Sequence, residues 1–232
     1  RVQWDDASPC LPDDSIFGSE AGDLVIGSNA GRGGVERFDV VVDKGSWLSS
    51  LSSTNDTLLI LASGLAGNPE ITAEGPDYDA FVAALTAIAE YMCAQHAGDG
   101  EGATHLITCH VTGAPDLTIA RAVSRSVVCS NLFKAAVFGR DANWGRILCA
   151  IGYTPGDFSI DKVCVRLASA AGEVYVCENA AYHPFSEEQA AQVLSQRDIL
   201  VKVDMGLGDA QAKAWGCDLT YDYVRINGDY RT

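Results

Sequence analysis

The chain is organised around a glycine-rich stretch, Gly98-Asp99-Gly100-Glu101-Gly102-Ala103-Thr104, which lies between a helical pattern and a strand-like one. Three glycines in five residues let the backbone take positive φ and approach other groups closely. Glu101 is an acid with no base beside it in the sequence. The pattern therefore predicts either a tight turn with an exposed acid or a loop that presents one carboxylate to a ligand.

This loop does not match the glycine patterns that bind nucleotide phosphates. Its Gly-x-Gly-x-Gly spacing has no Gly-Lys-Ser or Gly-Lys-Thr continuation, which a P-loop requires. It also follows a helix and precedes a strand, which is the reverse of a dinucleotide-binding turn. We therefore expect no nucleotide role for the loop.

Hydrophobic periodicity predicts regular elements on both sides of the loop. Before it, four apolar side chains recur at helical spacing, so a helix is expected over residues 77–97, with Gly98 as its C-cap. These side chains are Phe81, Leu85, Ile88 and Met92. After the loop, residues 104–111 alternate as a strand does, and Asp116 opens the next helix.

The later part of the chain continues this mixture of helices and strands. The elements expected are a hairpin of residues 163–167 and 173–177, a helix over 186–196, strands over 199–205 and 214–219, and a helix over 221–230. Several strands are joined as hairpins. The predicted fold class is therefore α+β with mixed layers, not a doubly wound parallel sheet.

The composition is that of a globular protein with a strong acidic balance. The 232 residues are 47% hydrophobic, and 16 Lys and Arg against 31 Asp and Glu give a net charge of −15. Nucleic-acid binding needs a basic footprint, so no nucleic-acid partner is expected. No apolar run is long enough to span a membrane, and the first residues lack a signal-peptide pattern, so no membrane association is expected.

Eight cysteines are spread along the chain without the spacing of a metal site. They are Cys10, Cys93, Cys109, Cys129, Cys149, Cys164, Cys177 and Cys217. None forms a Cys-x-x-Cys pair, and the count is low for a disulfide scaffold of this length. We expect buried, reduced thiols in a cytoplasmic protein.

Two other groups of residues are candidates for chemistry. The segment 139–146 combines two arginines, an acid and an amide, and is interpreted as a salt-bridge and hydrogen-bond knot. Carboxylate binding through Arg140 or Arg146 is the alternative. Among the histidines, His105 and His110 have an odd separation, which would place them on opposite faces of one strand. No metal site is expected.

Four stretches together resemble the ornithine acetyltransferase family of arginine biosynthesis, the bifunctional glutamate N-acetyltransferases. They are Ser53-Thr54-Asn55-Asp56-Thr57, the loop 98–104, the segment 139–146, and the run AWGCDLTYDYVRIN from Ala214 to Asn227, with the chain ending at Thr232. The resemblance runs from Ser53 to the C-terminus. Their order and length make the resemblance specific.

The resemblance implies a fold and a domain division. It predicts a mixed layered α/β sandwich of the ornithine acetyltransferase (DmpA-like) type, in the α+β class. Residues 51–232 are expected to form a domain similar to the family's β chain. Residues 1–50 do not match the family and are expected to form an atypical segment, with a glycine-rich loop and a candidate strand at residues 38–42.

The resemblance also implies an activity. In that family a precursor cleaves itself before a threonine into an α and a β chain. The freed threonine takes an acetyl group from N-acetylornithine and passes it to glutamate through an acyl-enzyme. The expected partner is therefore an α chain, in a heterotetramer in the cytoplasm, with small amino acids as substrates. No cofactor is expected, and acetyl-CoA serves some members as acetyl donor.

Three residues of this sequence match the family's substrate contacts. Glu101 corresponds to the acid of the Gly-Glu-Gly-Ala-Thr loop and suits an ornithine ammonium, while Asn227 and Thr232 correspond to the Asn near the end and the terminal Thr. No catalytic residue carries over, because no threonine precedes Thr54. The expected function is acetyl transfer as the β-chain-like part of the enzyme. The alternative is a catalytically incomplete remnant that binds an ornithine-like amino acid without turnover.

Overall fold

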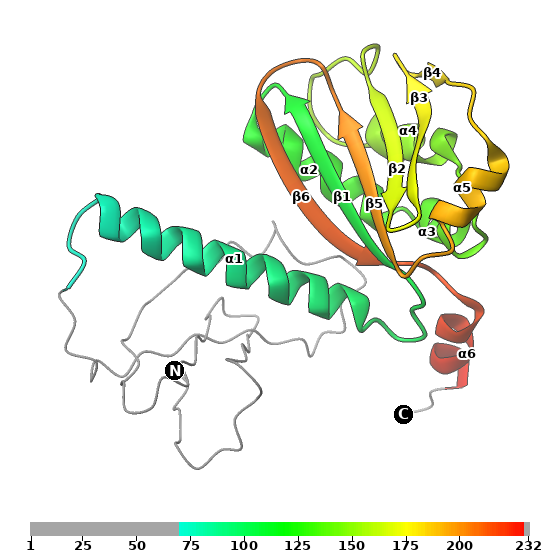
Figure 1. The fold of residues 1–232 in the computed structure, drawn as a ribbon, viewed down its shortest axis with the longest axis horizontal. Helices are drawn as coiled ribbons and strands as arrows, with labels where there is room; N and C mark the ends of the chain where they lie inside the picture. Colours follow the sequence, from blue (N-terminus) through cyan, green and yellow to red (C-terminus); the bar gives the residue numbers. More distant parts are fainter. Residues whose placement is uncertain (1–69, 230–232) are drawn as a thin grey trace. The chain divides into compact units, whose positions relative to one another are not determined.

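The computed structural model describes residues 70–229, which form helices and one sheet (Figure 1). In chain order the elements are α1 (Pro76–Gly98), β1 (Leu106–Ala114), α2 (Leu117–Cys129), α3 (Asn131–Phe138), α4 (Trp144–Gly152), β2 (Cys164–Ser169), β3 (Gly172–Glu178), β4 (Ala181–Tyr182), α5 (Glu187–Val193), β5 (Asp198–Asp204), β6 (Ala210–Cys217) and α6 (Tyr221–Asp229). The expectations for residues 1–50, for the run 53–57 and for Thr232 lie outside the described residues. Within residues 70–229, no helix combines the length and apolar character needed to cross a membrane.

Helix α1 occupies the range that its apolar periodicity predicts and carries two acids in its first turn, where the helix dipole favours them. The chain divides into two compact units after Met92, so the last turns of α1 belong to the unit that contains the sheet. There Cys93 and Ala97 pack against Trp215 of β6. The loop that follows α1 therefore starts from a helix end that is anchored on the sheet.

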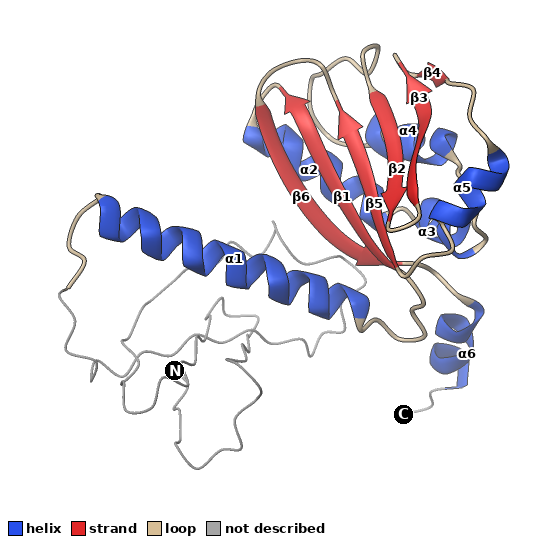
Figure 2. Ribbon diagram, in the orientation of Figure 1, coloured by secondary structure: helices blue, strands red, loops and turns tan. Residues whose placement is uncertain are grey.

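The strands form one mixed sheet in the order β4-β3-β2-β5-β1-β6. β1 runs parallel to β5, and the other neighbouring strands are antiparallel. β2 and β3 form the hairpin that the sequence predicts. Figures 1 and 2 show α2 and α4 against one face of the sheet, and α2 packs on β1 and β6. The prediction of mixed α+β layers, rather than a doubly wound parallel sheet, is confirmed.

The core lies between this face of the sheet and its helices. Alternate residues of the neighbouring strands β1 and β5 are at most 1% exposed: Ile107, Cys109 and Val111 of β1, and Ile199, Val201 and Val203 of β5. Ile119, Val123 and Val127 of α2 and Ile147 and Ile151 of α4 pack against them. Each such side chain contributes about 1.5–3 kcal/mol when buried, so β1 is firmly held.

Several boundaries differ from the sequence prediction. β1 covers Leu106–Ala114 instead of residues 104–111, and β6 begins at Ala210 instead of at residue 214. β6 ends at Cys217 and does not continue to Leu219. The backbone nitrogen of Asp218 still donates to His105 O at 3.3 Å, and its carboxylate bonds with the segment before β1. Helix α5 is shorter than the predicted range 186–196. Ser186 caps its start from outside the helix, and Leu194 is the C-cap at its end.

The cysteines are only partly buried. Seven of them lie in the described residues, and none of these seven forms a disulfide. Four are buried: Cys93, Cys109, Cys177 and Cys217. Cys149 is exposed, so the expectation of buried thiols applies to part of the set.

Candidate functional site

The pairing of β1 with β6 determines where the glycine loop lies. These strands are antiparallel, with Leu106 opposite Cys217, so the start of β1 lies beside the end of β6. The loop before β1 therefore meets the segment that follows β6, although more than a hundred residues separate them in the chain.

The loop between α1 and β1 is a tight turn that requires glycine at two positions, Gly100 and Gly102. Ala103 N donates a hydrogen bond to Gly100 O at 2.9 Å. At Gly100, a Cβ atom would lie 2.7 Å from Cys217 Sγ. At Gly102, φ is +68° and a Cβ atom would lie 2.8 Å from Tyr223 N. Side chains are thus excluded at both positions, by packing at the first and also by backbone conformation at the second.

Asp218 ties the end of the loop to the end of β6. Its carboxylate accepts hydrogen bonds from the backbone nitrogens of Thr104 (2.8 Å) and His105 (2.9 Å). It also accepts one from Thr104 Oγ1 (2.5 Å) and lies 2.8 Å from His105 Nδ1. Burial opposes ionisation of this carboxyl group, but the hydrogen bonds from His105 and Thr104 outweigh it and lower the pKa of Asp218. A buried carboxylate therefore holds the loop in its charged form.

The side chains of Thr104, His105 and Asp218 do not have the arrangement of a nucleophilic triad. Thr104 Oγ1 and Asp218 Oδ2 both meet the same ring nitrogen of His105, Nδ1, each at 2.8 Å. A triad needs the hydroxyl at one ring nitrogen and the acid at the other. We therefore assign these three residues a structural role.

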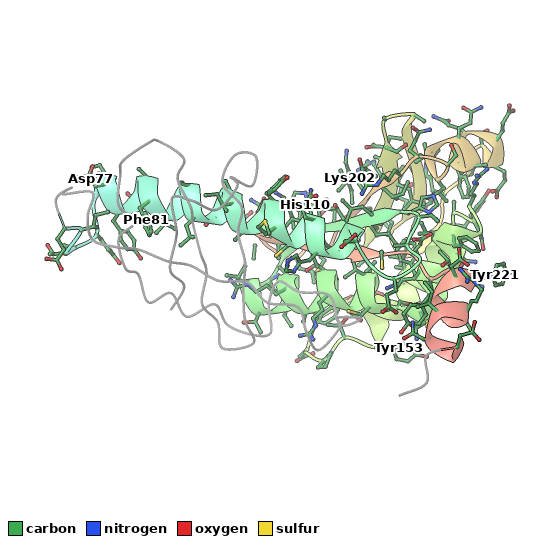
Figure 3. The ribbon with its side chains drawn as sticks, turned by 90° about the horizontal axis from the view of Figure 1, so that it is seen from below. Asp77, Phe81, His110, Tyr153, Lys202 and Tyr221 are labelled. Atoms are coloured by element: carbon green, nitrogen blue, oxygen red, sulfur yellow. The ribbon has the colours of Figure 1, made fainter. Side chains whose placement is uncertain are left out.

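Helix α6 is attached to the loop through Thr220. Thr220 Oγ1 donates to Gly102 O (2.7 Å) and accepts from Tyr223 N (3.2 Å) at the start of the helix. Tyr221, labelled in Figure 3, is 83% exposed, and its ring meets that of Phe138 edge-on. No residue of Tyr221–Asp229 is buried. Because so short a helix is marginal alone, these polar contacts with the loop are what position α6.

The loop and α6 bring together two of the three predicted substrate contacts. Asn227 Nδ2 donates hydrogen bonds to Glu101 Oε2 at 2.7 Å and to Tyr223 O at 2.9 Å. Both partners can only accept, so chemistry determines which way the amide points. The side chains of Glu101 and Asn227 are exposed. Thr232, the third predicted contact, lies outside the described residues.

This pair offers a ligand acceptor atoms and no donor. The two hydrogens of Asn227 Nδ2 are both used. In the described part of the chain, Glu101 Oε1 and Asn227 Oδ1 take part in no hydrogen bond. The arrangement therefore suits a ligand group that donates several hydrogens, such as a primary ammonium, and does not suit a carboxylate.

Comparison with known proteins identifies the family. A family model described as the ArgJ family matches residues 48–232. The chain belongs to the ArgJ family. The resemblance to the ornithine acetyltransferases of arginine biosynthesis is thereby confirmed.

Curated relatives in the ArgJ family are named arginine biosynthesis bifunctional protein ArgJ. One from Caldanaerobacter subterraneus is 48% identical over 180 residues, which make up 78% of this chain and 45% of that protein. One from Geobacillus stearothermophilus is 48% identical over 181 residues, or 78% of this chain and 43% of that protein. The chain thus spans less than half the length of these relatives.

A solved structure shows the same fold. It is the crystal structure of arginine biosynthesis bifunctional protein ArgJ from Bacillus halodurans, with a TM-score of 0.71 and 42% sequence identity. The match covers 79% of this chain and 84% of that chain. The α+β fold expected from the resemblance is confirmed.

The segment 139–146 is a hydrogen-bond knot, although the internal salt bridge expected there is not found within the described residues. Asn143 caps α4 by accepting from Arg146 N (3.2 Å), and its amide donates to Asp141 (2.9 Å). Arg146 Nη1 donates to Leu132 O (2.7 Å). The guanidinium is thus bonded to a backbone carbonyl rather than to an acid.

The two histidines lie in different environments, and only His110 belongs to β1, since His105 directly precedes this strand. His105 is buried beside Asp218, whereas His110 (Figure 3) is half-buried and meets Gln211 at 3.1 Å. Within residues 70–229, no group of three or more His, Cys, Asp or Glu is placed to hold a metal ion.

Sequence reasoning misses the residues that hold the loop of this ArgJ-family chain. The predicted strand over residues 214–219 includes Asp218 in the sheet, and no role is assigned to Thr220 from the sequence. The chemical type of Asp218 and Thr220 is the feature of the sequence that could have indicated this role. A carboxylate and a hydroxyl directly after an apolar strand can form hydrogen bonds with the backbone of a neighbouring loop.

Gly102→Ala is expected to lower the free energy of unfolding by about 1–3 kcal/mol, because alanine resists a φ of +68°. The new Cβ would also press on Tyr223 N. Urea denaturation followed by circular dichroism measures the change. Gly228→Ala is the matched control, because its Cβ would meet no atom within 4 Å. Equal stability of the two variants would contradict the role given to Gly102.

Proposed function

We propose that this chain is the substrate-binding, β-chain-like part of an acetyltransferase of arginine biosynthesis. With an α-type chain, it transfers an acetyl group from N-acetylornithine to glutamate through an acyl-enzyme. The observation that carries this proposal is the Glu101–Asn227 pair, joined at 2.7 Å and exposed on the surface.

The acceptor atoms of this pair match the end of the ornithine side chain. Ornithine ends in a primary ammonium, which can donate to Glu101 Oε1 and Asn227 Oδ1 together. Hydrogen bonds to charged groups of this kind contribute about 1.5–3 kcal/mol each. The net charge of −15 favours a cationic ligand in addition. In this proposal Thr232 contacts the remaining polar atoms of the amino acid.

The proposal gives this chain a binding role and assigns no catalytic residue to it. The hydroxyls of Thr104 and Thr220 are engaged with Asp218 and with Gly102 O, so neither is assigned as nucleophile. The full proposal includes an α-type partner in a heterotetramer, a cytoplasmic location and no cofactor, with acetyl-CoA as a further acetyl donor. Residues 51–232 form the β-chain-like domain in this proposal, and residues 1–50 the atypical segment.

The second candidate function is binding of an ornithine-like amino acid without turnover. It is favoured by one observation: in the described residues, the side chains of Thr104, His105 and Asp218 do not have the arrangement of a nucleophilic triad. Both functions use the same Glu101–Asn227 pair, so only an activity measurement separates them.

Acetyl transfer by the purified chain, alone and combined with the α-type chain of an ArgJ relative, tests the proposal. Labelled acetyl is followed from N-acetylornithine into glutamate, and ornithine binding is measured by calorimetry. We expect transfer in the combined sample and less transfer in the Glu101→Gln variant. Ornithine binding without transfer would favour the second function, and the loss of both would reject the two functions together.

A further inference from the structure

Lys134 of α3 is a buried lysine beneath the glycine loop. It is 0% exposed, and within the described residues its Nζ has one hydrogen-bond partner, Cys217 Sγ, at 3.8 Å. Its backbone oxygen accepts a hydrogen bond from Leu219 N (3.3 Å), so the same residue also contacts the segment that follows β6. The ammonium group therefore has a weak partner for a charge that has left water.

This environment shifts Lys134 toward its neutral amine form, relative to a lysine in water. Burial lowers the pKa of Lys134, although the Cys217 and Cys129 sulfurs and the Asp218 carboxylate act in the opposite direction. The neutral form of lysine carries a free lone pair on Nζ, and this nitrogen lies 3.8 Å from Cys217 Sγ. The pair thus combines a nucleophilic nitrogen with an oxidisable thiol.

Cys217 lies between Lys134 and the surface loop. It is 8% exposed, and its Sγ is so close to Gly100 that a Cβ there would lie 2.7 Å away. Gly100 itself is half-buried and has no side chain to cover the sulfur. Cys217 thus retains a small exposed fraction, and no side chain at Gly100 covers its sulfur, so a small oxidant needs little space to reach it.

We propose that Cys217 and Lys134 form a modification site, at which hydrogen peroxide joins the two side chains through a sulfur–nitrogen bond. First the Cys217 sulfur attacks one peroxide oxygen, the O–O bond breaks, and the sulfenic acid and one water form. Then Lys134 Nζ attacks the sulfur, the S–O bond breaks, and the hydroxide leaves as a second water with a proton from nitrogen. The sulfur loses two electrons and the peroxide gains them, so thiol, amine and peroxide give the sulfenamide and two waters.

Other buried cysteines provide the contrast. Burial raises the pKa of the Cys109 thiol, and it raises that of Cys177 to about 11, which keeps both as unreactive thiols. Cys177 Sγ lies against the carbonyl of Val163, which offers no nucleophile. The combination of a sulfur near the surface and a buried amine is thus specific to the Cys217–Lys134 pair among these three sites.

The link changes the support of the loop. The S–N bond draws the sulfur from its place against Gly100 toward α3, since the two atoms start 3.8 Å apart. It also removes a basic nitrogen from the neighbourhood of Asp218. The Gly98–Thr104 loop is therefore expected to change its position when the site is oxidised.

Peptide mapping of the peroxide-treated chain tests this proposal. After a short exposure to hydrogen peroxide, the protein is unfolded, remaining thiols are alkylated, and the protease-digested peptides are weighed. We expect the peptides with Lys134 and Cys217 joined, with a mass lower than their sum by the two hydrogens lost, about 2 Da, and separated by dithiothreitol. Cys129→Ala should retain the link, and Lys134→Met should lose it.

Three outcomes in the unmutated chain would overturn the proposal, and none depends on whether a variant folds. They are a disulfide between Cys129 and Cys217, sulfinic acid at Cys217 without a link, and an unreacted thiol at Cys217 after treatment that oxidises the exposed Cys149. The map of the unmutated chain alone therefore decides the question.

Discussion

Replacing Asp218 with alanine is expected to lower the free energy of unfolding by about 3–5 kcal/mol, because several donors lose a charged acceptor and hydrogen bonds to charged groups are worth about 1.5–3 kcal/mol each. The change leaves the backbone nitrogens of Thr104 and His105 and two side-chain groups without their acceptor. Among the described residues, the Asp218 carboxylate is the only one that bonds this loop to the end of β6, and the variant lacks it. Urea denaturation at pH 7 measures the difference.

The pH dependence of this difference provides a second check. The pKa of Asp218 is lowered in the folded state, because the hydrogen bonds from His105 and Thr104 outweigh burial. Its stabilisation is thus fully present above the unfolded pKa, about 3.9, and is lost as pH falls through the lower folded value. The stability gap between the native chain and the Asp218→Ala variant should therefore narrow below about pH 4.

An acid on the surface gives the matched control for this prediction. Asp222 pairs with Arg225 at 2.9 Å, but the two side chains are 60% and 66% exposed. Asp222→Ala should cost at most about 1 kcal/mol, as exposed ion pairs do. If Asp218→Ala costs no more than Asp222→Ala, or if its gap stays constant down to pH 2, the role assigned to Asp218 is wrong.

Replacing Glu101 with glutamine is expected to weaken the binding of ornithine about tenfold to a hundredfold. The substitution keeps the size of the side chain and an acceptor oxygen but removes the charge, and hydrogen bonds to charged groups are worth about 1.5–3 kcal/mol. It also replaces the carboxylate that accepts from Asn227, so the pair loses its fixed orientation. Calorimetric titration with ornithine measures the change in affinity. This prediction rests on the proposed function.

Asp99→Asn is the control for this experiment. Asp99 is an exposed residue of the same loop, two positions from Glu101, and its backbone nitrogen donates a hydrogen bond to Gln95 O. Both variants lose one negative charge, so a general electrostatic effect would weaken binding equally in the two. Equal affinities for the two variants would remove Glu101 from the site, whereas a selective loss in Glu101→Gln supports a direct contact.

The elements around the site can be predicted from sequence because their signals are local. The spacing of Phe81, Leu85, Ile88 and Met92 indicates α1, and all four are half-buried in the structure. Likewise, the hairpin of β2 and β3 follows from two apolar runs around Gly172. Each of these patterns involves residues within a few turns or positions of one another, and backbone geometry repeats over that range.

The contacts that hold the candidate site join residues that are far apart in the sequence, so no local pattern indicates them. The sequence offers no rule that Asp218 bonds with His105, 113 positions away, or that Thr220 bonds with Gly102 O. The predicted strand over residues 214–219 likewise gives no sign that the Asp218 side chain binds the loop before β1.

By itself the sequence determined the α+β class, the order of most elements, and an acid in a loop where glycines permit close approach. Only the tertiary structure decided that Glu101 lies 2.7 Å from Asn227 and that the pair presents acceptor atoms alone. The physical reason is the antiparallel pairing of β1 and β6, with Leu106 opposite Cys217. This pairing brings the start of one strand to the end of the other, and it depends on a sheet register that no local pattern encodes.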